Sequence, residues 1–251
     1  TVSEFSKQGI VKDLKVPAER VFVTPEGVDA GFYHPPVRRG RGARETRKRK
    51  VASRILAHGA DDERKNLFNI LKAVSLVQKK GKRVTLDILG MEEADARRTG
   101  YARWVKEWGM ESSVRWMGHV SKEKVRESYH KADVFLYVSR WEGFGLPILE
   151  AFACGVPVLS SNKTALPEVA GGAACLVDPE KSCEIAEELD RLLRHPSLRA
   201  EWIKKGYARA KQFSWERTAQ ATLDVYRKVL LEMEYDTSGK RIETHGEGSP
   251  E

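Results

Sequence analysis

Short apolar runs alternate with longer helical patterns along most of this 251-residue chain. Two of the runs, DVFLYV at 133–138 and VPVLS at 156–160, are apolar on both faces, as strands buried inside a parallel sheet must be. Short connections between such strands and helices produce right-handed β-α-β units. The alternation therefore predicts an α/β protein with a Rossmann-like, doubly wound parallel sheet.

The same pattern gives approximate bounds for each element. We expect strands near 51–58, 84–89, 114–117, 134–138, 156–160 and 174–177. We expect helices near 66–80, 92–108, 121–132, 146–153, 182–194, 196–212 and 215–233, and a further short helix after the letters SEFS at 3–6.

Composition divides the chain into five parts. Residues 1–36 form a first unit, and a basic linker follows at 37–50. The Rossmann-like domain occupies 51–213, and a C-terminal helix covers 214–233. Residues 234–251 are polar and glycine-rich, so we expect this tail to be disordered.

The formal net charge of +8 comes almost entirely from one segment. RRGRGARETRKRK at 38–50 holds eight Arg and Lys residues and one Glu, a local charge of +7, which leaves about +1 for the rest of the chain. Because glycine and like charges oppose packing, a solvated linker is the first interpretation. Peripheral contact with an anionic membrane surface is the second. Nucleic-acid binding ranks last, because no aromatic residue is interleaved with the basic ones, and we expect no nucleic-acid partner.

No run is long and apolar enough to cross a membrane, and the first residues lack the apolar core of a signal peptide. The chain begins with Thr1 rather than Met, and we expect it to be a piece of a longer protein. The three scattered cysteines, Cys154, Cys175 and Cys183, favour reduced thiols and disfavour a metal site. We therefore expect a cytoplasmic location, with peripheral contact at the inner face of the membrane as an addition to it.

A glycine-rich turn follows one of the predicted strands. Gly143 and Gly145 remove side chains where the backbone turns sharply, and Pro147 marks the first turn of the next helix. The turn exposes the amides of Phe144, Gly145 and Leu146 at a helix N-terminus, which is a site for an anion, most naturally a phosphate. In a doubly wound sheet, ligands bind beyond the carboxyl ends of the strands, which is where this turn is expected to lie.

Two glutamates, Glu142 and Glu150, flank the turn. Eight helical residues span about 12 Å, which exceeds the roughly 5–9.5 Å between paired carboxyl groups that cleave a glycosidic bond. The spacing suits two carboxylates that hold different hydroxyl-bearing ends of one ligand, in the order sugar, phosphate, ribose. On spacing alone, a structural interpretation is equally good: Glu142 would be only a turn residue, and Glu150 a partly buried acid at the cap of a helix.

The stretch SRWEGFGLPILEAFACGVPVLSSNKTALPEVAGGAACLVDP at 139–179 resembles the signature of family 4 of the retaining nucleotide-sugar glycosyltransferases. The Glu-x7-Glu pair, the Gly-Phe-Gly turn, ACGVPV and LPEVAG recur together in that family. RKNLFNILKAV, LDILG, VRWMGHVSKEKVRESYHKADVFLYVS and FSWERTAQATLDVYRKV also match. Residues 1–36 resemble the end of the family's N-terminal domain and its interdomain linker. The resemblance covers residues 1 to about 232 and implies the C-terminal half of a glycosyltransferase B fold, with 51–213 as the nucleotide-sugar-binding domain.

The resemblance implies a role for each matching residue. Glu150 would bind the ribose hydroxyls, Glu142 the donor sugar, and the amides of 144–146 the diphosphate. Lys65, in DDERKN, matches the lysine that neutralises the departing diphosphate, where a compact ammonium stabilises charge that grows during transfer. Gly90 would close a second turn under the nucleotide. The catalytic candidates are Glu142 and Lys65, and the donor-binding candidates are Glu150, Gly143, Phe144, Gly145, Leu146, Gly59, Gly90, Arg64 and Thr164, with Ala165 and Leu166 lining the same cleft beside Thr164.

One departure from the family pattern concerns the phosphate site. The family usually has an arginine five residues before the lysine, in a Gly-Arg pair, whereas this chain has Gly59-Ala60. Either Arg64, Arg54 or Arg140 takes the place of that arginine, or the phosphate site is weakened.

The function that the resemblance implies is the donor-binding part of a retaining glycosyltransferase, which moves a sugar from a nucleoside-diphosphate sugar to a glycan, lipid or small-molecule acceptor. No resident cofactor is implied, and no metal, because no Asp-x-Asp-like ligand set lies near the donor site. Most of the family's N-terminal acceptor domain is absent from the sequence, so we expect this chain to need that domain or a partner chain for activity. The alternative is a non-catalytic nucleotide-sugar-binding or scaffolding subunit. The LPEVAG loop slightly favours GDP-mannose over a UDP-linked donor.

Overall fold

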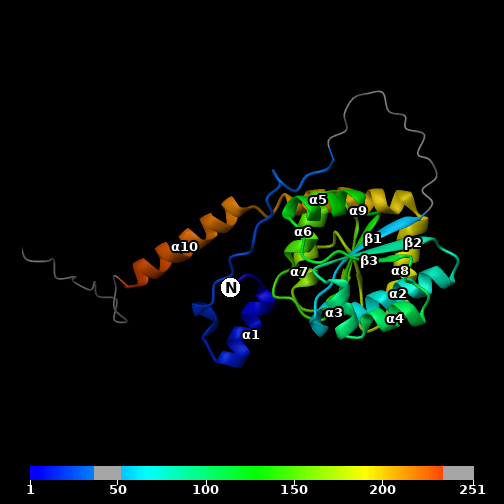
Figure 1. Ribbon diagram of the computed structural model, residues 1–251. Coiled ribbons are helices and arrows are strands. Elements are labelled where there is room, and N and C mark those ends of the chain that lie inside the picture. The colour runs from blue at the N-terminus through cyan, green and yellow to red at the C-terminus, as the bar shows by residue number, and fades with distance from the viewer. Residues whose placement is uncertain (37–51, 234–251) are drawn as a thin grey trace, which may run out of the picture.

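A single parallel sheet organises the computed structural model, which describes residues 1–36 and 52–233. Its six strands lie in the order β3-β2-β1-β4-β5-β6 (Figure 1). The strand bounds are β1 Ser53–His58, β2 Val84–Leu89, β3 Val114–Trp116, β4 Val134–Tyr137, β5 Val158–Ser161 and β6 Cys175–Val177. This order confirms the predicted doubly wound sheet, whose direction of winding reverses between β1 and β4.

Ten α-helices accompany the sheet in the described part of the chain. They are α1 Glu4–Leu14, α2 Leu67–Lys79, α3 Glu93–Arg98, α4 Tyr101–Glu107, α5 Lys122–Lys131, α6 Leu146–Ala153, α7 Leu166–Ala170, α8 Ser182–Arg194, α9 Pro196–Ala210 and α10 Trp215–Met233. Two short 3-10 turns, η1 Ala18–Arg20 and η2 Glu63–Lys65, complete the elements.

Three differences from the predicted helices have local causes. The single helix expected at 92–108 is two helices, because Gly100 adopts a φ of +85° and interrupts it. Helix α7 was not predicted, since five residues are too few to show a helical period. Helix α1 begins within SEFS rather than after it, because the Ser3 side chain accepts a hydrogen bond from the Ser6 amide and caps the helix at its start.

The helices pack on both faces of the sheet, with α2, α4 and α8 on one and α5, α6, α7 and α9 on the other (Figure 1). Strand β1 shows why both layers are needed. Ile55 and Ala57 belong to the core on the α2 side, whereas Leu56 belongs to the core on the α6 side, and all three are fully buried. The strands are therefore apolar on both faces, as the sequence predicted.

The first 36 residues lie against the loops at the carboxyl ends of the strands and against the helices on the α6 side of the sheet. Val28 and Tyr33 are buried in the core on the α6 side, and the Thr218 hydroxyl of α10 donates to the Pro25 carbonyl at 2.7 Å. The Ser3 hydroxyl donates to the Gly143 carbonyl at 2.6 Å. These contacts place α1 beside the glycine-rich turn.

Several sequence-based expectations concern parts that the structure does not describe. The basic linker at 37–50 and the tail at 234–251 both lie outside the described residues. Within the described ranges, no helix is long and apolar enough to cross a bilayer. All three cysteines are free thiols, of which Cys154 and Cys175 are buried and Cys183 is exposed.

Candidate functional site

The loops that follow β1 and β4 meet at the point where the sheet reverses its winding, the usual place for a ligand in this architecture. The Arg140 amide donates to the Arg64 carbonyl at 2.7 Å, which joins the two loops through their backbones. The buried Asn66 side chain donates to the Val138 carbonyl at 3.0 Å and to the Pro179 carbonyl at 2.7 Å. The loops are thus fixed to one another by buried hydrogen bonds.

The two catalytic candidates are in direct contact at this point. Lys65 Nζ lies 2.8 Å from Glu142 Oε1 and 3.3 Å from the Tyr137 hydroxyl. The Tyr137 hydroxyl donates to the same Glu142 oxygen at 2.7 Å. The side chains of Lys65 and Glu142 are 26% and 16% exposed, so both charged groups remain accessible from solvent. The structure therefore assembles a cation and a carboxylate that are 77 positions apart in the chain.

The glycine-rich turn has the geometry of an anion site. Gly145 adopts a φ of +124°, and a Cβ there would lie 2.7 Å from Leu166 Cδ2, so the position requires glycine. Helix α6 begins directly afterwards, with proline in its first turn. None of the described hydrogen bonds uses the amides of Phe144, Gly145 or Leu146 as a donor. These amides and the positive end of the α6 dipole are available to an anion.

Gly143 differs from Gly145 in what its position requires. Its φ is not positive, and a Cβ on it would meet nothing closer than Ser6 Oγ at 3.6 Å. The backbone bends at Gly143 as the sequence predicted, but neither its φ nor its surroundings require glycine there. Its carbonyl instead accepts hydrogen bonds from the Ser3 and Ser6 hydroxyls, which fasten α1 to the turn.

The loop after β5 supports the site from a third side. Thr164 has a φ of +56°, and its hydroxyl oxygen accepts a hydrogen bond from the Glu142 amide at 3.2 Å. Ala165 and Leu166 were expected to line the cleft, but both are fully buried. They form the packed base of the turn, since Leu166 fills the space where a Gly145 side chain would project.

Gly59 and Gly90 end β1 and β2 and pack against each other. A Cβ on Gly90, whose φ is +83°, would lie 2.7 Å from the Gly59 carbonyl oxygen, and a Cβ on Gly59 would lie 2.6 Å from Ile88 Cγ2. Close packing of the backbones accounts for both glycines and keeps the floor of the site free of side chains.

Glu150 lies in α6, in a different environment from Glu142. The Tyr129 hydroxyl donates to Glu150 Oε2 at 3.1 Å. Burial raises the pKa of the Glu150 carboxyl, and hydrogen bonds from Tyr33 and Tyr129 oppose that rise. Among the described hydrogen bonds the two glutamates have no partner in common, which agrees with two carboxylates that serve different ends of one ligand.

His58 ends β1 between these two environments. Its ring lies 6.4 Å from that of Tyr129, 6.0 Å from that of Tyr137 and 5.4 Å from that of Phe135. Burial and the nearby Lys65 lower the pKa of His58 to about 4, so the imidazole is neutral. Its Nε2 atom is buried without a hydrogen-bond partner in the described structure.

The three arginines considered as substitutes at Ala60 are all paired with acids. Arg64 is exposed, donates to the Asp62 carboxylate and lies over the ring of Trp141 at 5.7 Å. The Arg140 guanidinium donates to Glu180 at 2.6 and 3.0 Å. These contacts direct the guanidinium groups of Arg64 and Arg140 to acids, and not to the unused amides of 144–146.

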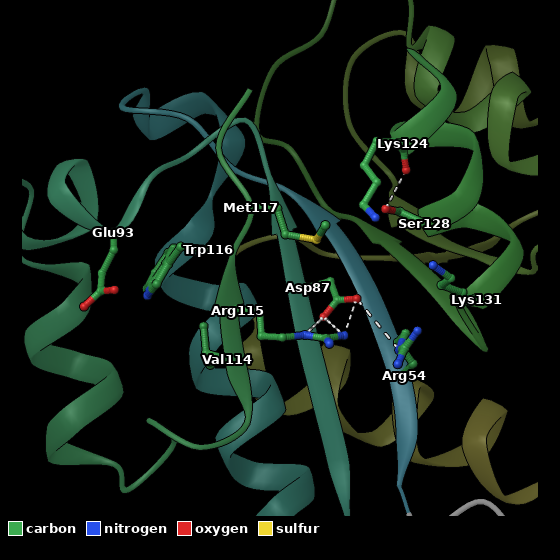
Figure 2. A pocket seen from close by; sticks show the side chains of 10 residues that line it. All are labelled: Arg54, Asp87, Glu93, Val114, Arg115, Trp116, Met117, Lys124, Ser128 and Lys131. Carbon is green, nitrogen blue, oxygen red and sulfur yellow. Dashed lines mark hydrogen bonds and ion pairs between the residues drawn. The ribbon is translucent and has the colours of Figure 1, made fainter. Parts of the chain in front are cut away.

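Arg54 lies at the other end of β1, in a groove of about 490 Å³ (Figure 2). Figure 2 shows the Arg54 and Arg115 side chains directed at Asp87, which is buried between them. Asp87 accepts hydrogen bonds from Arg115 at 2.6 and 2.7 Å and forms a longer ion pair of 3.8 Å with Arg54. The structure therefore does not bring Arg54 to the glycine-rich turn.

Sequence reasoning missed three residues of the site: Tyr129, Tyr137 and His58. Tyr137 carries the one hydroxyl in the apolar run DVFLYV, and a buried tyrosine hydroxyl needs a hydrogen-bond partner. That signal was present at 137, but it does not say which acid is the partner. Within the described ranges, the site included, no group of three or more His, Cys, Asp or Glu side chains is arranged to hold a metal ion.

Comparison with known proteins gives consistent results. Residues 43–209 match the family described as Glycosyl transferases group 1. The O-antigen chain mannosyltransferase B of Escherichia coli is 33% identical over 237 residues, which are 90% of this chain and 59% of that protein. The MMP alpha-(1->4)-mannosyltransferase of Mycolicibacterium hassiacum is 32% identical over 235 residues, 92% of this chain and 54% of that protein. The chain thus spans little more than half the length of either relative.

The fold is similar to that of Anabaena Alr3699/HepE, solved in complex with UDP and glucose. The TM-score is 0.74 at 18% identity, and the match covers 91% of this chain and 62% of that one. This similarity confirms the predicted fold class.

Proposed function

The chain belongs to the Glycosyl transferases group 1 family, and from this we propose that it is the donor-binding part of a retaining glycosyltransferase that uses a nucleoside-diphosphate sugar. The observation that carries the proposal is the contact between Lys65 and Glu142 beside the unused amides of 144–146. A cation, a carboxylate and free amides at the switch point of a doubly wound sheet suit a ligand that has both phosphates and hydroxyls.

We assign one part of the donor to each group. The amides of 144–146 hold the diphosphate, and Lys65 neutralises the charge that grows on it as it leaves. Glu142 accepts hydrogen bonds from the sugar, and Glu150 from the ribose. In the transfer step, the bond between the sugar carbon and the diphosphate oxygen breaks. A bond to the acceptor oxygen forms on the same face, and the acceptor proton passes to the diphosphate. The step as proposed uses no resident cofactor and no metal ion.

The relatives point to the donor sugar. The two curated relatives described above are mannosyltransferases, and this supports a mannosyl donor, with GDP-mannose as the first candidate. The complex of the Anabaena protein with UDP supports a uridine donor as the second. The acceptor would be held by an N-terminal domain or a partner chain. The basic run at 37–50 would add peripheral contact with an anionic membrane.

Thermal denaturation in the presence of UDP, GDP, UDP-glucose and GDP-mannose tests the proposal. A ligand at a hundredfold excess over its Kd stabilises the fold by about 2.7 kcal/mol, which for a chain of this length raises Tm by roughly 5–10 °C. Lys65→Ala should abolish the shift given by the nucleoside diphosphate. If none of the four compounds raises Tm, the chain is not a donor-binding domain.

Ala60 favours a second candidate, a non-catalytic nucleotide-sugar-binding subunit, because it removes one cation from the phosphate site. Both candidates predict nucleotide binding. They differ in whether sugar is transferred once the chain is joined to an acceptor domain. An assay with a radiolabelled donor would detect that transfer. Binding without transfer would support the subunit.

A further inference from the structure

Each of the two glutamates accepts a hydrogen bond from its own buried tyrosine. The Tyr137 hydroxyl, from β4, donates to Glu142 Oε1 at 2.7 Å. The Tyr129 hydroxyl, from α5, donates to Glu150 Oε2 at 3.1 Å. Tyr137 is 2% exposed and Tyr129 is fully buried, so neither side chain can bind a ligand itself. Tyr129 contacts the proposed donor site through Glu150. Tyr137 contacts it through Glu142 and through Lys65, whose Nζ lies 3.3 Å from the Tyr137 hydroxyl.

The bonds at Glu142 leave one carboxylate oxygen available. Tyr137 and Lys65 both donate to Oε1, whereas no hydrogen bond within the described residues involves Oε2. A carboxylate whose first oxygen is held by two donors cannot rotate freely. Its second oxygen therefore keeps one direction and can accept a hydrogen bond from a sugar hydroxyl.

The two tyrosines belong to one aromatic cluster, which consists of His58, Tyr129, Phe135 and Tyr137. The ring of Phe135 lies 5.3 Å from that of Tyr129 and 5.5 Å from that of Tyr137. Packing of this kind fixes the rings, and the hydroxyls with them. Burial, followed by the adjacent glutamate, raises the pKa of each phenol, so both hydroxyls remain protonated donors at neutral pH.

We propose that Tyr137 and Tyr129 are positioning residues that divide donor recognition between them, with Tyr137 orienting Glu142 toward the sugar and Tyr129 orienting Glu150 toward the ribose. The assignment of the ligand's two ends rests on the function proposed above. The division follows from the structure. Of the two glutamates, the Tyr137 hydroxyl forms a hydrogen bond with Glu142 alone, and the Tyr129 hydroxyl forms one with Glu150 alone.

Two matched substitutions, Tyr137→Phe and Tyr129→Phe, test this division. Each removes one oxygen atom and keeps the ring in the cluster. Hydrogen bonds to charged groups correspond to roughly 10- to 100-fold in affinity. Tyr137→Phe should leave the Kd for GDP within about twofold of the parent value and remove the additional affinity for GDP-mannose. Tyr129→Phe should weaken GDP and GDP-mannose binding by the same factor, so that the ratio of the two Kd values is unchanged.

Isothermal titration of the whole chain measures these constants, with UDP and UDP-glucose used instead if thermal denaturation selects uridine. Tyr226→Phe, at an exposed position on α10, is the control for the substitution itself. If the parent binds no nucleotide, the proposed function fails. The division is refuted if the parent binds but both variants weaken the binding of the diphosphate and of the sugar conjugate by the same factor. It is also refuted if neither variant changes the affinity for either ligand. In both cases the tyrosines only stabilise the fold.

The pKa of the Glu150 carboxyl gives a second readout that needs no ligand. Glu150 faces Tyr33, Tyr129, Tyr137, Cys154 and Lys122, and the hydrogen bonds from Tyr33 and Tyr129 hold its pKa below the value that burial alone would give. Tyr129→Phe should therefore raise the Glu150 pKa, measured by carboxyl carbon NMR, whereas Tyr137→Phe should leave it unchanged. Equal behaviour of the two variants would contradict the separate bonding of the two glutamates.

Discussion

Asn66 is the residue whose replacement should most sharply test how the two site loops are joined. It follows Lys65 directly, is 1% exposed and has a φ of +57°. Its side-chain amide donates to the Val138 and Pro179 carbonyls. Asn66→Ala removes three buried hydrogen bonds, the two that its amide donates and the one that its Oδ1 accepts from Asn69, each of about 1 kcal/mol, and leaves the Val138 carbonyl unpaired, at a further cost of about 1 kcal/mol. Alanine at positive φ adds roughly 1 kcal/mol of strain. We expect a loss of about 4–6 kcal/mol in the free energy of unfolding.

Two further variants separate these contributions. Asn69 is also buried and its amide also makes two bonds, one to Asn66 Oδ1 at 2.9 Å and one to the Pro179 carbonyl at 3.1 Å, but it lies within α2 at ordinary helical φ. Asn69→Ala should therefore cost only about 2 kcal/mol. Asn66→Gly should be more stable than Asn66→Ala by roughly 0.5–1 kcal/mol, because glycine relieves the strain at positive φ.

Urea denaturation followed by circular dichroism measures all three variants. Suppose that Asn66→Ala lowers the free energy of unfolding by no more than Asn69→Ala does, and that Asn66→Gly is no more stable than Asn66→Ala. Then neither the loop connection nor the backbone conformation of Asn66 is a significant constraint. In that case the position of Lys65 must be fixed by its own contacts with Glu142 and Tyr137.

Three other outcomes follow from the site. Gly145→Ala should lower the free energy of unfolding by about 2–4 kcal/mol, because its φ is positive and the new Cβ would be too close to Leu166. Gly143→Ala should lower it by under about 1 kcal/mol, and thermal melts compare the two variants. The neutral form of His58 stabilises the fold fully above its unfolded pKa of 6.5, and this stabilisation is lost as pH falls toward about 4, up to about 3 kcal/mol in all. His58→Leu should therefore be less acid-sensitive than the parent when unfolding is measured between pH 7 and 4. Ala60→Arg should strengthen nucleoside-diphosphate binding by about 1–3 kcal/mol in a calorimetric titration, and no change would mean that Lys65 and the free amides already satisfy the phosphates.

Local pattern was sufficient for most of the fold. The bounds predicted for the strand at 84–89 and for the helices at 146–153 and 182–194 are those observed, because periodicity and terminal residues act over a few positions. The break at Gly100 was missed, since one glycine within a helical pattern is compatible with either a continuous or an interrupted helix.

The sequence by itself also determined which residue types surround the glycine-rich turn, including both glutamates and the lysine of DDERKN. Only the tertiary structure decided their partners. Strand order sets β1 beside β4, and this brings Lys65 to Glu142 across 77 positions. The same order sends Arg54 to Asp87 at the other end of its strand. Hydrogen bonds and ion pairs depend on distances of a few ångströms, and those distances are set by the packing of whole elements, which local periodicity does not encode.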